Sequence, residues 1–182
     1  AFCPRDAENV IDLIRNADAA MYYSKQNGGN TFAFYAPEMN AASVERLMLK
    51  SKLRRALERD ELIVNYQPKV DLRTGRIVGA EGLLRWRLPG HGDIPPSQFI
   101  PLAEESGHIL PMGCWVLREA CRTATTWPPH LRVAVNLSAL HFSSPTLIDD
   151  VRRALDESGL SPHRLELEIT ESAAMQNPSA TI

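Results

Sequence analysis

Strand-like and helix-like segments alternate along most of this chain. The expected strands span residues 76–86, 131–140 and 164–171, and the expected helices span 96–127 and 146–158. Strands that alternate with helices of this length form units in which helices connect parallel strands and cover the sheet. The sequence therefore predicts an α/β fold with a largely parallel sheet.

One more strand precedes this alternation. Residues 62–68 are strand-like, and the turn at residues 73–75 separates them from residues 76–86. A parallel connection needs a crossover of about a dozen residues or more, whereas antiparallel neighbours can be joined by a short turn. We therefore expect the first strand of the sheet to run against the second.

The N-terminal part follows a different pattern. Residues 6–26 have the apolar spacing of a helix, with Asp6 as its N-cap and Gly28 and Gly29 as its stop, and residues 31–35 alternate like a short strand. One helix and one strand cannot bury a core of their own. Residues 1–35 are therefore expected to be the end of a domain that begins earlier in a longer protein, which agrees with the lack of an initiator Met.

A second amphipathic helix is expected over residues 43–59, where apolar residues share one face and a cluster of basic residues lies on the rest of the helix. A charged helix of this kind between two domains is typical of a connector. We therefore place a linker at residues 36–59 and the main domain at residues 60–182.

Composition excludes several functions. The net charge is −2, so no basic surface field favours DNA or RNA, and no apolar run reaches the length of about 20 residues that a membrane span needs. The three cysteines include no CxxC pair, which favours a reducing cytoplasm over a disulfide framework. Cys114 and Cys121 are expected to be buried as small hydrophobic residues. The five histidines lack ligand spacing, so zinc is not expected.

Polar residues gather on one face of the predicted sheet. Successive strand residues point to opposite faces, and by this parity Asn136 and Glu168 oppose the apolar residues of their strands, while Glu81 shares its face with Leu83 and Arg85. All three are expected toward the carboxyl ends of their strands. Carboxylates are rarely buried unless they are paired or bind metal. Two carboxylates and an amide are hard oxygen donors that suit Mg²⁺, Mn²⁺ or Ca²⁺. The alternative is a set of salt-bridged residues at the end of a sheet.

Two further side chains could reach the same place. Arg85 shares its face with Glu81 and could bind a phosphate beside the metal, or alternatively form a salt bridge to Glu81 or Glu168. Gln67 ends the first strand and could point into the pocket, or instead cap a neighbouring loop.

Five motifs together resemble the EAL-domain family, whose signature reads Glu-Ala-Leu-Leu-Arg-Trp. They occur in the order and approximate spacing of that family and cover residues 53–182. The motifs are Tyr66-Gln67-Pro68, Glu81-Gly82-Leu83-Leu84-Arg85-Trp86, the segment from Pro95 to Glu104, Asn136-Leu137-Ser138, and Glu168-Ile169-Thr170-Glu171-Ser172.

The N-terminal segment resembles a second family. The run from Ala17 to Tyr22, followed by Lys25 and by the Gly-Gly-Asn turn, is similar to the closing helix and turn of GGDEF diguanylate cyclase domains. This resemblance covers residues 1–35, and the GGDEF signature itself does not occur in the chain. The segment from residue 43 resembles the connector of tandem GGDEF–EAL proteins.

The resemblance implies a modified (β/α)₈ barrel with an antiparallel first strand, here truncated after about four strands. It implies hydrolysis of cyclic di-GMP to linear pGpG with Mg²⁺ or Mn²⁺ in bacterial second-messenger signalling. It also implies a homodimer formed through the EAL domain, with a GGDEF domain as neighbour in the same chain.

The resemblance also assigns roles to individual residues, by their positions in the matching motifs. Glu81, Asn136 and Glu168 match the family's metal ligands, and Glu171 matches a glutamate that steadies a catalytic loop. The resemblance thus makes Glu81 and Glu171 the expected catalytic residues. The expected substrate contacts are Arg85 at the phosphate, Gln67, and Pro95 and Phe99 in the segment that forms the substrate pocket.

The sequence departs from the family in two ways. Gly82 replaces the alanine of the signature, which is expected to weaken local order at most, since it points away from the face of Glu81. The family's later motifs, an aspartate pair, a lysine and a further glutamate, would fall beyond Ile182. We therefore expect the 182 residues alone not to hydrolyse cyclic di-GMP, and the full-length protein to do so.

Two other functions fit the same residues. A degenerate EAL domain could bind cyclic di-GMP as a sensor without cleaving it, although it would not need to keep metal ligands. A scaffold could regulate a neighbouring GGDEF domain through the connector helix.

Overall fold

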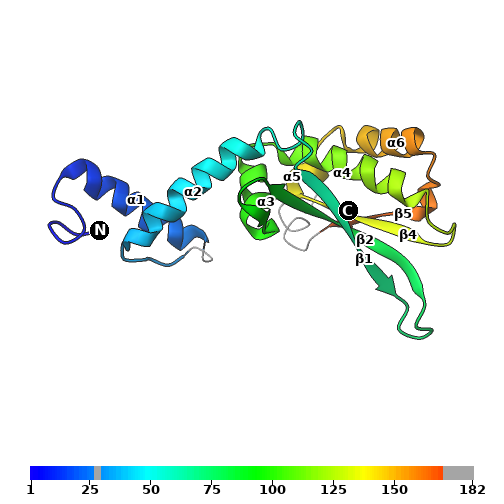
Figure 1. Cartoon of the computed structure of the whole chain (residues 1–182), viewed down its shortest axis with the longest axis horizontal. Helices are drawn as coiled ribbons and strands as arrows, with labels where there is room; N and C mark the ends of the chain where they lie inside the picture. Colours follow the sequence, from blue (N-terminus) through cyan, green and yellow to red (C-terminus); the bar gives the residue numbers. More distant parts are fainter. Residues whose placement is uncertain (27–29, 170–182) are drawn as a thin grey trace. The chain divides into compact units, whose positions relative to one another are not determined.

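The computed structural model describes residues 1–26 and 30–169 (Figure 1). The chain divides into two compact units, Ala1–Lys52 and Leu53–Ile182. Within the described ranges, none of the helices combines the length and apolarity that crossing a bilayer requires.

The first unit contains helices α1 (Val10–Gln26) and α2 (Pro37–Leu53). Helix α1 starts later than the sequence predicted, because Asn9 and not Asp6 provides the N-terminal cap. The Asn9 Oδ1 atom accepts a hydrogen bond of 2.9 Å from the Asp12 backbone N–H, whereas the Asp6 carboxylate accepts one from the Phe2 backbone. A side-chain acceptor at this position satisfies a backbone N–H that has no partner inside the helix.

Two other predictions for this unit are wrong. Residues 31–35 do not form a strand, and no strand lies beside them in the described part of the first unit. Helix α2 begins at Pro37 rather than at residue 43, because proline fits the first turn of a helix, where its missing N–H is not needed. The same helix ends at Leu53 and is followed by turns, so it is shorter than expected at its C-terminal end.

The second unit is built on one mixed sheet. Its strands are β1 (Leu62–Val70), β2 (Ile77–Leu88), β3 (Gly92–Ile94), β4 (Arg132–Leu137) and β5 (Leu165–Ile169). The order is β1-β2-β4-β5, and β3 pairs with β2. Strands β1 and β2 are antiparallel, while the β2–β4 and β4–β5 pairs are parallel, which confirms the predicted α/β sheet with a reversed first strand. The three-residue strand β3 was not predicted.

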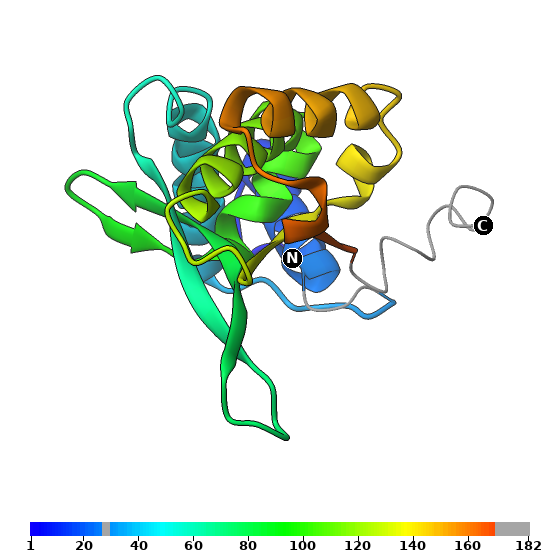
Figure 2. The same ribbon diagram turned by 90° about the vertical axis from the view of Figure 1, so that its right-hand side faces the viewer.

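Helices connect and cover these strands. They are α3 (Pro96–Glu105), α4 (Ile109–Ala124), α5 (Ala139–Phe142) and α6 (Leu147–Ser158), with a 3-10 turn at Pro162–Arg164. The long helical stretch predicted at residues 96–127 is thus two helices. Helices α4 and α6 lie side by side on one face of β4 and β5, and the β1–β2 hairpin extends beyond the helical layer (Figure 2).

The core lies between this helical layer and the sheet. Val133 and Val135 of β4 are buried against α4 and α6, as strand parity predicted. A neighbouring part of the core contains Trp86, whose ring meets Phe99 edge to face with centroids 5.9 Å apart. The Trp86 Nε1–H donates a 3.1 Å hydrogen bond to the buried Glu61 carboxylate, so its polar atom is satisfied.

Candidate functional site

Glu81, Asn136 and Glu168 occupy three adjacent strands of the sheet. The Asn136 Nδ2–H donates a 2.6 Å hydrogen bond to Glu81 Oε1, which joins β2 to β4. Asn136 and Glu168 are register partners in the parallel β4–β5 pair. Directly paired residues of neighbouring strands share a face, so all three polar side chains line one face, with Asn136 and Glu168 near the carboxyl ends of β4 and β5 and Glu81 near the middle of β2. In α/β folds this end is where ligands bind.

Lys69 on β1 also reaches this polar face. Its Nζ lies 2.8 Å from Glu166 Oε2 and 2.8 Å from Glu168 Oε1. Glu166 has a second cationic partner, Arg132, at 3.1 Å. These hydrogen-bonded carboxylates raise the pKa of Lys69 to about 12, and Lys69 followed by Arg132 lowers the pKa of Glu166. One side of the site therefore consists of salt-bridged residues, which was the predicted alternative to a metal site.

Lys69 is a residue of this face that the sequence motifs did not predict. The signal that could have revealed it is parity, because Lys69 is two positions from Gln67 and so points to the same face of β1. What the sequence did not contain is the curvature that lets a lysine on β1 reach β5, which is three strands away in the sheet order.

Replacing Lys69 with methionine should destabilise the protein slightly at neutral pH. The carboxylates are about one-third exposed, so each ion pair should contribute about 0.2–1 kcal/mol. Because the pKa of Glu166 is lowered, its contribution is complete above the ordinary glutamate pKa of about 4.3 and is lost as the pH falls through the lowered value. Urea unfolding should show a deficit at pH 7 that vanishes in acid.

Arg153→Met on the exposed surface of α6 is the matched control for that experiment, with no deficit expected at either pH. A Lys69→Met deficit of equal size at neutral and acid pH would contradict the ion-pair explanation.

Arg85 lies at a cavity of about 320 Å³ at the carboxyl ends of β2 and β4. Asn136 lines the same cavity, and apolar residues including Ile100 and Val116 form much of its wall. Arg85 Nη1 donates a 2.9 Å hydrogen bond to the Leu84 carbonyl. Among the described residues Arg85 forms no ion pair, so the predicted alternative of a bridge to Glu81 or Glu168 is not seen there.

The remaining predicted site residues are distributed differently. Gln67 is exposed and is the register partner of Glu81, which places it on the polar face. Pro95 is exposed just before α3, while Phe99 is completely buried against Trp86. The structure therefore places Phe99 in the core, and Pro96 and Ile100 line the cavity instead. Glu171 lies outside the described residues.

Gly82 sits where β2 is closely covered by its neighbours. A Cβ atom at this position would lie 3.3 Å from Val64 Cγ1 and 3.4 Å from the Ala134 carbonyl oxygen. These distances are tight, so the neighbours would have to shift by a few tenths of an ångström to admit alanine. The glycine thus permits a close approach of strands here rather than merely loosening the chain.

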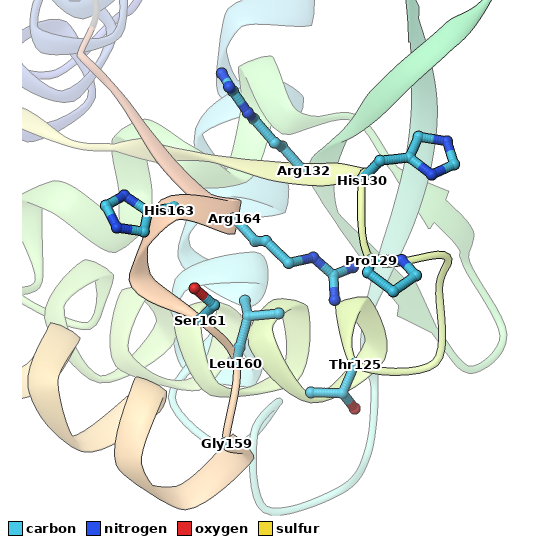
Figure 3. A pocket seen from close by; sticks show the side chains of 9 residues that line it. All are labelled: Thr125, Pro129, His130, Arg132, Gly159, Leu160, Ser161, His163 and Arg164. Atoms are coloured by element: carbon cyan, nitrogen blue, oxygen red, sulfur yellow. The ribbon is translucent and has the colours of Figure 1, made fainter.

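A larger hollow of about 570 Å³ lies at the opposite, N-terminal end of β4 and β5 (Figure 3). Arg164 donates hydrogen bonds there to the carbonyls of Leu131 at 2.8 Å and Ala124 at 2.7 Å. Arg132, on the same rim, is paired with Glu166. Arg164 therefore holds the loop before β4, and both arginines at this rim have hydrogen-bond or ion-pair partners within the protein.

Comparison with known proteins agrees with this fold. Residues 50–182 match the EAL domain family. The whole chain is 47% identical over 186 residues to the bifunctional diguanylate cyclase/cyclic di-GMP phosphodiesterase MucR of Pseudomonas aeruginosa, of which it covers 27%. It is 39% identical over 180 residues to the cyclic di-GMP phosphodiesterase PdeR of Escherichia coli, with 97% of the chain and 27% of PdeR covered.

A solved structure supports the same relationship. The structure of the PaMucR phosphodiesterase in complex with c-di-GMP superposes with a TM-score of 0.71 at 48% identity, covering 74% of this chain and 56% of that one. The chain thus spans about a quarter of these curated relatives and about half of the solved domain. The predicted fold, the N-terminal half of an EAL-type barrel, is confirmed, and the chain belongs to the EAL domain family.

Proposed function

We propose that the full-length protein hydrolyses cyclic di-GMP to linear pGpG with the help of Mg²⁺ or Mn²⁺. The observation that carries this proposal is the meeting of Glu81, Asn136 and Glu168 on three adjacent strands of an EAL domain. The related MucR and PdeR proteins are named as cyclic di-GMP phosphodiesterases, which supports the same substrate.

The donor set fits a hard divalent cation. Glu81, Asn136 and Glu168 offer carboxylate and amide oxygens from neighbouring strands. A bound metal would activate a water as the nucleophile and neutralise phosphate charge. The three side chains would hold the ion, and the hydrogen bond between Asn136 and Glu81 would fix their orientation.

Arg85 is proposed to orient the phosphodiester. It lines the cavity beside Asn136, and its guanidinium can donate two parallel hydrogen bonds to a phosphate. Gln67 is proposed as a polar contact on the same face, and Pro95 as part of the loop that shapes the pocket entrance. Glu171 is proposed to support a catalytic loop, as its position in the family motif implies.

The Lys69–Glu168 ion pair favours a second candidate function. The Lys69 ammonium group already lies 2.8 Å from Glu168 Oε1, which is one of the proposed metal ligands. If the lysine kept its place in the presence of metal, the domain would bind cyclic di-GMP as a non-catalytic sensor.

Residues 1–35 are proposed to be the C-terminal end of a GGDEF domain, with residues 36–59 as the connector. The full coverage of the chain by its match to the bifunctional MucR supports this assignment, as does the division of the chain near residue 52. A cytoplasmic location belongs to the same proposal and is supported by three free cysteines. Homodimer formation through the EAL domain stays a prediction of the family resemblance.

Incubation of the purified full-length protein with cyclic di-GMP tests the proposal. We expect pGpG to form in the presence of Mg²⁺ or Mn²⁺, to stop after chelation by EDTA, and to resume when the metal is restored. Binding of cyclic di-GMP without pGpG formation, even with Mn²⁺, would contradict hydrolysis and favour the sensor. Lys69→Met should distinguish the two further, because removing the competing ammonium should strengthen metal-dependent turnover only if the site is catalytic.

A further inference from the structure

Three potential metal ligands from three helices meet on the outer side of the sheet. His141 Nε2 of α5 lies 3.9 Å from Cys114 Sγ of α4 and 3.6 Å from Asp150 Oδ2 of α6. All three atoms lie within 4.8 Å of one another. The cluster is separate from Glu81, Asn136 and Glu168, and it involves a histidine and a cysteine for which the sequence had predicted no metal.

The cluster is preorganised by burial. The His141 side chain is 2% exposed and that of Asp150 is 15% exposed. His141 packs so closely on Gly113 that a Cβ atom there would lie 2.5 Å from its Nδ1 atom. This contact lets the imidazole approach α4 with Nε2 directed at Cys114 and Asp150. A larger residue at position 113 would displace the ring.

Neighbouring hydrogen bonds hold the ligands in place. Ser138 caps α5 by accepting a 3.1 Å hydrogen bond from the His141 backbone N–H. Thr146 Oγ1 donates a 3.0 Å hydrogen bond to Asp150 Oδ2. Such outer contacts are characteristic of metal sites, where they orient the ligands.

The distances are close to those of a tetrahedral zinc site. Zinc binds sulfur at about 2.3 Å and nitrogen or oxygen at about 2.0–2.2 Å, which places neighbouring ligand atoms of a tetrahedron roughly 3.3–3.6 Å apart. The His141–Asp150 separation of 3.6 Å lies at the upper end of that range, and the Cys114–His141 separation of 3.9 Å exceeds it by a few tenths of an ångström. Small side-chain rotations would therefore bring all three atoms onto one ion.

We propose that Cys114, His141 and Asp150 bind a Zn²⁺ ion, with a fourth position open to water. A set of one thiolate, one imidazole and one carboxylate suits Zn²⁺ and not Mg²⁺ or Ca²⁺, which prefer oxygen ligands alone. His141 and Gly113 also line the 320 Å³ cavity that contains Arg85 and Asn136, so the ion would lie directly behind a wall of that cavity.

Binding requires loss of the Cys114 proton. Burial and the neighbouring Asp150 carboxylate raise the pKa of the Cys114 thiol, while Arg118 on the same helix opposes them. From α5 and α6 the facing groups are His141 and Asp150. Zinc binding therefore releases one proton from the thiol.

Cobalt titration of the full-length protein tests the site without using its enzymatic activity. Excess Mg²⁺ and the Glu81→Gln background suppress binding to the oxygen ligands. One Co²⁺ ion should bind with a thiolate-to-cobalt charge-transfer band and the intense visible bands of tetrahedral geometry, and Zn²⁺ should displace it. Cys114→Ser and Asp150→Asn should each weaken binding by at least about tenfold and remove or shift these bands.

Matched controls change residues of the same types outside the cluster. Cys3→Ser and Asp149→Asn should leave the bands and the stoichiometry unchanged, since Cys3 is exposed and Asp149 pairs with Arg152. Circular dichroism of each variant establishes that it is folded. An unchanged cobalt spectrum in folded Cys114→Ser protein, or no thiolate band in the parent, would overturn the zinc site.

Discussion

Replacing Glu81 with alanine is expected to reduce hydrolysis of cyclic di-GMP by the full-length protein on the order of 10²-fold or more. The substitution removes one proposed metal ligand and also the acceptor of the 2.6 Å hydrogen bond that orients Asn136. Both effects act on the same ion, so the loss should appear mainly in kcat. Formation of pGpG at saturating metal measures it.

Glu81→Gln separates charge from geometry. Glutamine keeps an oxygen that can accept the Asn136 hydrogen bond but lacks the negative charge that a divalent cation needs. We expect a nearly normal thermal unfolding temperature and a loss of activity close to that of alanine. Glu157→Ala, on the exposed face of α6, is the control and should keep full activity. An active Glu81→Gln enzyme at low metal concentration would show that Glu81 is not a ligand.

Replacing Phe99 with alanine should cost about 3–5 kcal/mol of unfolding free energy. The Phe99 ring is completely buried and packs edge to face against Trp86, so its removal leaves a cavity that the surrounding helix and strand cannot fill. Urea unfolding followed by circular dichroism measures the loss. Fluorescence is unsuitable, because the variant changes the surroundings of Trp86.

Phe99→Leu decides between a core residue and a substrate contact. Leucine retains most of the apolar volume, so we expect a loss of less than about 1.5 kcal/mol and an unchanged KM. Ile100→Ala should behave in the opposite way, with a raised KM and a smaller loss of stability, because Ile100 lines the cavity and is only partly buried. A raised KM in folded Phe99→Leu protein would restore Phe99 as a substrate contact.

Local patterns in the sequence were sufficient for much of the second unit. Strand parity placed Glu81 and Asn136 on one face, and the short turn after β1 predicted the antiparallel β1–β2 pair. These features depend on neighbours along the chain, whose side chains alternate at a fixed period. For the same reason the family motifs, each a short run, were readable without coordinates.

The first unit shows the limit of such patterns. The sequence predicted a strand at residues 31–35 because its residues alternate, but a strand forms only when another strand supplies hydrogen-bond partners. The start of α1 was misplaced because Asp6 and Asn9 are both good caps, and the choice between them depends on the contacts of each side chain in the folded unit.

The tertiary structure alone decided which distant residues meet. Lys69 reaches Glu168 across the sheet, Phe99 turns into the core beside Trp86, and Cys114 meets His141, which is 27 positions away in the chain. No periodic pattern in the sequence predicts these contacts, because each depends on how helices and strands pack around one core. The sequence determined the family, the strand faces and the candidate metal ligands. The packing decided which residues pair with the candidate metal ligands, which residues line the cavity beside Arg85, and where Cys114, His141 and Asp150 meet.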